Sequence, residues 1–133
     1  MTMHTPNGLR SSLGRVRGLG SAKHGTAHWW GLRLTSLALI LLCGWFVVKL
    51  LFCLAGGDYA TTLEWLKQPV PAALMCLFLL TGFHHAANGL QTVIEDYFHC
   101  ESMRLAFIIA VKFLAAAGAV IGVIAVGKIA FGG

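Results

Sequence analysis

The sequence predicts an all-α membrane protein with three antiparallel transmembrane helices, at about residues 34–55, 70–97 and 105–127, behind a basic N-terminal segment. Three observations lead to this fold class. The 133 residues are 57% hydrophobic and only 11% charged, whereas an ordinary soluble domain is about 25% charged. Each of the three ranges is long and apolar enough to cross a hydrocarbon core, which takes about 20 residues. Basic residues precede the first range, as expected beside a membrane helix.

This composition also limits the function. Ten basic and five acidic residues cannot cover the surface of a folded soluble domain with groups that water tolerates. A soluble enzyme and a nucleic-acid binder are therefore poor fits, and we expect membrane lipid and no nucleic acid as a partner. Residues 1–28 read as an extramembrane segment and residues 29–133 as the transmembrane anchor domain. The Arg- and Ser-rich, acid-free N-terminus also fits an organellar transit peptide.

The distribution of charge predicts the orientation. No acidic residue precedes Asp58. The basic residues before the first apolar run are Arg10, Arg15, Arg17, Lys23 and Arg33. Because basic residues are enriched on the cytoplasmic side, we expect a cytoplasmic N-terminus, or a matrix-facing one in a mitochondrion.

The first span has interfacial residues at both ends. Trp29 and Trp30 stand just before it, where aromatic rings favour the headgroup level. Lys49 is expected about two turns before its far end, where the stem lies in lipid and the ammonium reaches the interface. A short loop is then expected to hold Glu64, Trp65 and Lys67.

Proline and glycine mark the other two spans. Pro69 and Pro71 lie at the start of the second, where a missing amide donor does no harm. Gly118 and Gly122 form a GxxxG in the third. Such surfaces let helix backbones approach closely in lipid, although glycine is also simply common in membrane helices.

The second span carries a polar stripe. Residues three and four positions apart share one side of a helix. The stripe consists of Thr81, His84, His85, Asn88, Gln91, Thr92, Glu95 and Asp96. Polar groups at this depth are costly and usually face a bundle interior or a cofactor, or they hold helices together by hydrogen bonds.

The two histidines within the stripe could relay protons, bind a metal or ligate haem iron. They point about 100° apart, and every other histidine lies outside the apolar runs. This chain can therefore supply at most one axial haem ligand, and another subunit would provide the second.

Two stretches resemble a known family. The run from His85 to Gly89, followed by Asp96 and Tyr97, meets the pattern H-x(3)-G-x(6)-D-Y. It resembles the hydrophobic membrane anchor subunit (D subunit) of succinate dehydrogenase, respiratory complex II. An N-terminal stretch resembles the alphaproteobacterial branch and includes Gly20, Ser21, Ala22, Lys23, Gly25, Thr26, His28, Trp29, Trp30, Arg33 and Thr35.

The resemblance implies a membrane anchor of succinate:quinone oxidoreductase that passes electrons from an iron–sulfur subunit to ubiquinone. It favours a bacterial inner membrane over a mitochondrial one. It implies as partners a flavoprotein subunit, which oxidises succinate, the iron–sulfur subunit, and a second small membrane (cytochrome b) subunit that shares a haem b. No residue of this chain would oxidise succinate. A fumarate reductase anchor would run the same chemistry in reverse.

The resemblance also implies roles for individual residues. His85 would be the axial ligand of the haem iron, and His84 would replace it if the helix were rotated. Tyr97 would bind quinone, or else anchor the helix end as an interfacial aromatic residue. Asp96 would assist at the quinone site or be a solvated helix-end charge. Arg33 would pair with a haem propionate or act only as a topology signal.

Two other classes of function use a polar stripe in a small helical membrane protein. A non-catalytic scaffold or assembly subunit would use the polar stripe only for helix contacts, and it has no need of the H-x(3)-G-x(6)-D-Y spacing. A small transporter or proton channel would place His85 and Glu95 along a path. A transporter predicts inverted repeats or a broken helix, and the three unmatched spans offer neither.

Overall fold

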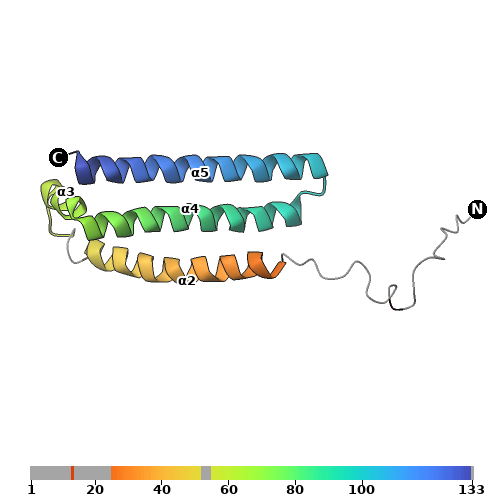
Figure 1. Cartoon of the computed structure of the whole chain (residues 1–133), viewed down its shortest axis with the longest axis horizontal. Coiled ribbons are helices and arrows are strands. Elements are labelled where there is room, and N and C mark those ends of the chain that lie inside the picture. Colours follow the sequence, from red (N-terminus) through yellow and green to blue (C-terminus); the bar gives the residue numbers. More distant parts are fainter. Residues whose placement is uncertain (1–12, 14–24, 52–54, 133) are drawn as a thin grey trace, which may run out of the picture.

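The computed structural model describes residues 13, 25–51 and 55–132, and this part of the chain forms four helices. They are α2 (Gly25–Lys49), α3 (Tyr59–Lys67), α4 (Pro69–Tyr97) and α5 (Glu101–Phe131). Figure 1 shows the three long helices side by side and antiparallel, with α4 in the middle. Within the described residues, α4 packs against both α2 and α5, which do not pack against each other.

All three long helices are able to cross a membrane by length and composition. They contain 25, 29 and 31 residues, which at 1.5 Å per residue is about 38 to 47 Å, more than a hydrocarbon core of about 30 Å. The predicted fold class is confirmed.

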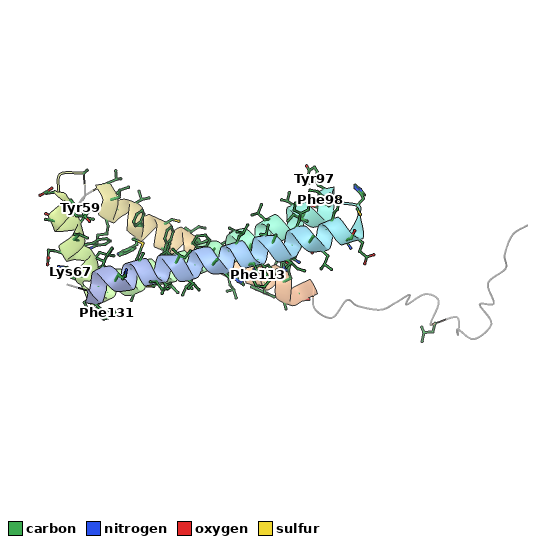
Figure 2. All side chains as sticks on the ribbon, turned by 90° about the horizontal axis from the view of Figure 1, so that it is seen from above. Tyr59, Lys67, Tyr97, Phe98, Phe113 and Phe131 are labelled. Atoms are coloured by element: carbon green, nitrogen blue, oxygen red, sulfur yellow. The ribbon has the colours of Figure 1, made fainter. Side chains whose placement is uncertain are left out.

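The chain has almost no core of its own. The buried hydrophobic residues in its described part are Leu42, Ala72, Ala87, Ile94, Ala119 and Val126. Figure 2 shows side chains standing out around the long helices, and Phe113 and Phe131 are 74% and 92% exposed. Because such apolar side chains are not stable in water, lipid or partner helices must cover them.

The helix ends differ from those expected. α2 begins at Gly25 rather than near residue 34, so it includes part of the segment expected outside the membrane. Its α-helical part ends at Lys49, and the chain continues through Leu50 and Leu51 in a π-helical turn, with the N–H of Ala55 donating to the carbonyl of Leu50 at 3.1 Å. α5 also extends past 105–127 at both ends. Hydropathy marks the stretch that lies in lipid, whereas backbone hydrogen bonds can continue the helix beyond it.

The expectation of a short loop after the first span is wrong in part, because this segment contains helix α3. The side chain of Asp58 caps the start of α3 by accepting a hydrogen bond from the backbone N–H of Tyr59 at 2.7 Å. Trp65 of α3 lies against Trp45 of α2, with ring centroids 5.6 Å apart. This packing fixes a short helix that is marginal alone. Pro69 then begins α4.

Small residues let α5 approach α4. A methyl group added to Gly118 would lie 2.6 Å from the ring of Phe83, and one added to Gly122 would lie 3.0 Å from Leu79. Both distances are shorter than a normal carbon–carbon contact. The close-packing interpretation of the GxxxG is therefore confirmed, and its partner is α4 of the same chain.

Candidate functional site

The polar stripe of α4 divides at its two histidines. The Nδ1 atom of His85 lies 2.9 Å from the hydroxyl oxygen of Thr35 on α2. The Nε2 atom of His84 instead lies 2.9 Å from the amide nitrogen of Asn88, one turn further along α4. The neighbouring rings thus point in different directions, as the helical period predicts.

Most of the stripe does not join helices. Besides the His84–Asn88 contact, Gln91 donates a hydrogen bond to Glu95 at 2.7 Å, and the Thr92 hydroxyl donates to the backbone carbonyl of Asn88 at 3.2 Å. These bonds all lie within α4. Among the described residues of the stripe, His85 alone makes a hydrogen bond to another helix. Hydrogen bonds between the helices of this chain therefore account for His85 in the stripe and not for its other members.

Thr35 is the residue whose role the sequence analysis missed. Its hydroxyl donates to the backbone carbonyl of Gly31 at 2.7 Å and lies 3.1 Å from that of Leu32. The hydroxyl is thus held against the backbone of α2 while it faces His85. A threonine in an apolar run is a weak signal, because hydroxyls often bond back to their own helix.

A cavity of about 630 Å³ lies between α4 and α5 next to His84, and Thr35 of α2 also lines it. His84, Asn88 and Thr81 line it from α4, and Lys112 lines it from α5. The rest of its wall is largely alanine, with Ala115 and Ala119 on α5. In the described part of the chain, Lys112 has no carboxylate within 4.0 Å.

Tyr97 and Asp96 lie at the end of α4, away from the histidines. Tyr97 is the last residue of the helix and is 77% exposed, and Asp96 is also exposed. The rise of a helix separates Tyr97 from His85 by about 18 Å. Figure 2 shows Tyr97 and Phe98 at the opposite end of the bundle from Tyr59 and Lys67. The structure does not bring Tyr97 and His85 into one site.

Arg33 lies near the depth of Thr35 but on another side of α2. Its guanidinium carbon is 4.6 Å from the centre of the Trp29 ring, and the side chain is exposed. Two helical positions separate Arg33 from Thr35, which turns their side chains about 200° apart. The structure does not place Arg33 against His85.

The residues around His85 fit a haem better than a metal ion held by protein side chains alone. Residues 25–51 and 55–132 contain no group of three or more His, Cys, Asp or Glu side chains able to hold a metal. His85 has one ring nitrogen, Nε2, outside its bond to Thr35. One turn along, a methyl group added to Gly89 would meet nothing within 4 Å. A flat macrocycle that brings its own four nitrogen ligands can approach such an open surface.

Comparison with known proteins agrees with this arrangement. A family model described as "Succinate dehydrogenase/Fumarate reductase transmembrane subunit" matches residues 1–119. A succinate dehydrogenase hydrophobic membrane anchor subunit of Rickettsia bellii is 36% identical over 106 residues, covering 78% of this chain and 82% of the relative. Its counterpart from Paracoccus denitrificans is 32% identical over 98 residues, covering 74% and 75%.

No solved structure gives a significant match to this chain. The relatives are bacterial and the chain has three helices able to span a membrane, which together indicate a multi-pass bacterial membrane protein. Since the family model matches most of the residues and two relatives exceed 30% identity, the chain belongs to the family of succinate dehydrogenase/fumarate reductase transmembrane subunits.

Proposed function

We propose that this chain anchors a succinate:quinone oxidoreductase in the bacterial inner membrane, supplies one axial ligand to a b-type haem and helps form the site of quinone reduction. The main support is the position of His85 on a helix able to span the membrane. Its Nδ1 atom contacts the hydroxyl of Thr35, and its Nε2 atom lies outside that bond. A flavoprotein subunit, an iron–sulfur subunit and a second small membrane subunit would complete the enzyme.

His85 would hold the haem through Nε2. When bound, the haem accepts and releases one electron at a time. The other small membrane subunit would supply the remaining haem ligand, because His84 points elsewhere and contacts Asn88. The open surface at Gly89 leaves room for the macrocycle or for a helix of that subunit.

Arg33 would bind a haem propionate. Its guanidinium lies over the ring of Trp29, and a guanidinium carries five N–H donors that match the geometry of a carboxylate.

Tyr97 and Asp96 would contribute to the quinone site at the end of α4. Reduction of a quinone to a quinol takes two electrons and two protons. The Tyr97 hydroxyl can donate a hydrogen bond to a quinone carbonyl and stabilise the charge that develops on its oxygen. Asp96 beside it can accept and pass on a proton. Both side chains are exposed in the isolated chain, so partner subunits would enclose the site.

Replacement of each histidine tests the haem assignment. In the assembled complex, we expect His85→Ala to abolish the low-spin b-type haem spectrum and His84→Ala to preserve it. Flavin content, and succinate oxidation with a soluble artificial acceptor, would show that both variants assemble. A low-spin spectrum that survives His85→Ala contradicts the assignment.

A further inference from the structure

We propose that Thr35 is the positioning residue of His85, which fixes the tautomer and the ring orientation that present Nε2 to the haem iron. This inference rests on the proposed haem ligation by His85. It concerns a residue of α2, whereas the ligand lies on α4, and it assigns a function to the contact between the two helices.

The proton of the Thr35 hydroxyl determines which group donates to which. A hydroxyl has one proton to donate and lone pairs that accept. The backbone carbonyl of Gly31 lies 2.7 Å from Oγ1 and accepts the hydrogen bond that this proton makes. The same oxygen therefore accepts at its contact with Nδ1 of His85, 2.9 Å away. The donor there must be an Nδ1–H group.

The other ring nitrogen of His85, Nε2, is the one that would bind iron. A neutral imidazole carries its proton on one nitrogen only, so a proton on Nδ1 leaves the lone pair of Nε2 free. Ligation of iron needs such a lone pair. Histidines that bind metals usually donate their other N–H to an acceptor, which fixes the ring and makes it a stronger ligand.

The ring of His84 makes a different contact. Its Nε2 faces the amide nitrogen of Asn88 at 2.9 Å, and an amide nitrogen only donates. The Nε2 lone pair of His84 is thus used by the hydrogen bond. Both rings therefore carry their proton on Nδ1, but only the Nε2 lone pair of His85 lies outside these hydrogen bonds and is available to iron.

The stiffness of Thr35 supports a positioning role. A β-branched side chain on a helix has few rotamers, and the bond to Gly31 restrains this one further. Ser36 offers a matched comparison, since its hydroxyl also bonds to a backbone carbonyl, that of Leu32 at 2.7 Å, with no histidine contact.

The experiment compares three variants in the assembled complex with haem. Thr35→Val keeps the branched shape and removes the acceptor, Thr35→Ser keeps the hydroxyl, and Ser36→Ala removes a hydroxyl that has only a structural bond. The measurements are haem bound per flavin, haem midpoint potential and carbon monoxide binding to the reduced haem.

We expect Thr35→Val to weaken haem retention by about tenfold, the low end of the range for such partners. Its midpoint potential should rise, because a less basic ligand stabilises ferric iron less, and carbon monoxide should bind as the His85–iron bond loosens. Thr35→Ser and Ser36→Ala should resemble the unaltered complex.

Two results would overturn the inference. One is a Thr35→Val complex with unchanged potential and no carbon monoxide binding. The other is an equal loss of haem in Thr35→Val and Ser36→Ala, which would indicate a role in helix packing alone. Failure of the proposed function is distinguished by His85→Ala: if that variant keeps its low-spin haem, the ligand assignment fails irrespective of Thr35.

Discussion

At the scale of single residues, adjacent positions on α4 have different chemistry because their rings face different neighbours. His85 meets a hydroxyl of α2 that serves as an acceptor, and His84 meets an amide donor on its own helix. The motif spacing favours His85 as the haem ligand over His84. The contacts of the rings support that proposal, since only the Nε2 atom of His85 lies outside these hydrogen bonds.

The same scale holds the prediction for Tyr97. Tyr97→Phe removes the hydroxyl and should lower quinone reductase activity by about tenfold or more, because loss of a hydrogen-bond donor to a developing oxyanion can cost ~10²-fold or more. Succinate oxidation with a soluble artificial acceptor should persist. Both rates are measured on purified complex.

Tyr59→Phe is the matched control for that substitution. Tyr59 is 75% exposed and lies at the other end of the bundle (Figure 2), so its loss should leave quinone reduction unchanged. Equal loss of both activities in Tyr97→Phe would indicate failed assembly and would count against a role at the quinone site.

At the scale of elements, α4 is the centre of the molecule and its two sides use different packing. Toward α2, Phe78 stacks on Phe46 with ring centroids 5.7 Å apart, and Thr35 meets His85. Toward α5, the glycines at 118 and 122 accept the side chains of Phe83 and Leu79. The large rings set the position of α2, whereas the small residues allow α5 a close approach.

Gly118 provides a test of that approach. Gly118→Val places methyl groups where the ring of Phe83 lies, and overpacking of this kind costs about 1–3 kcal/mol. We expect a lower unfolding temperature for the detergent-solubilised complex, followed by circular dichroism. Gly127→Val is the control, because a methyl group added at Gly127 meets nothing within 4 Å. Equal destabilisation by both substitutions would contradict a specific role for Gly118 in the close approach of α5 to α4.

At the scale of the whole molecule, the three long helices form a layer with two uncovered faces. Its few buried side chains cannot account for a stable domain in water. The N-terminal end of α2 lies at the same end of the bundle as the connection between α4 and α5, and α3 lies at the other end with the C-terminus of α5 (Figure 1). The charges before the first span predict that the former end is cytoplasmic.

Cys100 reports that orientation. It lies in the connection between α4 and α5, and hydrogen bonds from the Ser102 side chain and from the backbone at Met103 lower the pKa of its thiol. A lowered pKa leaves more thiolate at neutral pH, and thiolate is the form that reacts with maleimide. With Cys100 as the only cysteine, a membrane-impermeant maleimide should label inside-out vesicles and not right-side-out ones.

The vesicles are stripped of peripheral subunits first, so that no partner covers the thiol. Labelling only in right-side-out vesicles would reverse the orientation. A detergent-permeabilised sample is the control for reactivity in each preparation, and Ser102→Ala should slow labelling there because it removes the largest cause of the lowered pKa.

The amino-acid sequence by itself determined the fold class and the membrane-crossing helices, because a bilayer requires long apolar segments with internally bonded backbones. The period of the helix then determined that the polar residues of α4 share a side and that the two histidines diverge. The sequence pattern also indicated which residues of α4 to suspect, from His85 to Tyr97.

Only the tertiary structure decided where the helices end, that α3 is a helix, and that Thr35 meets His85. Hydropathy is blind to the first, because a helix can continue into water. Helix α3 depends on contacts with residues far away in sequence, because Trp65 meets Trp45 of α2 and the helix packs against α4 and α5. The Thr35–His85 contact depends on the depth and rotation of α2 against α4. Side-chain packing between the two helices sets both, and no local sequence pattern encodes that packing.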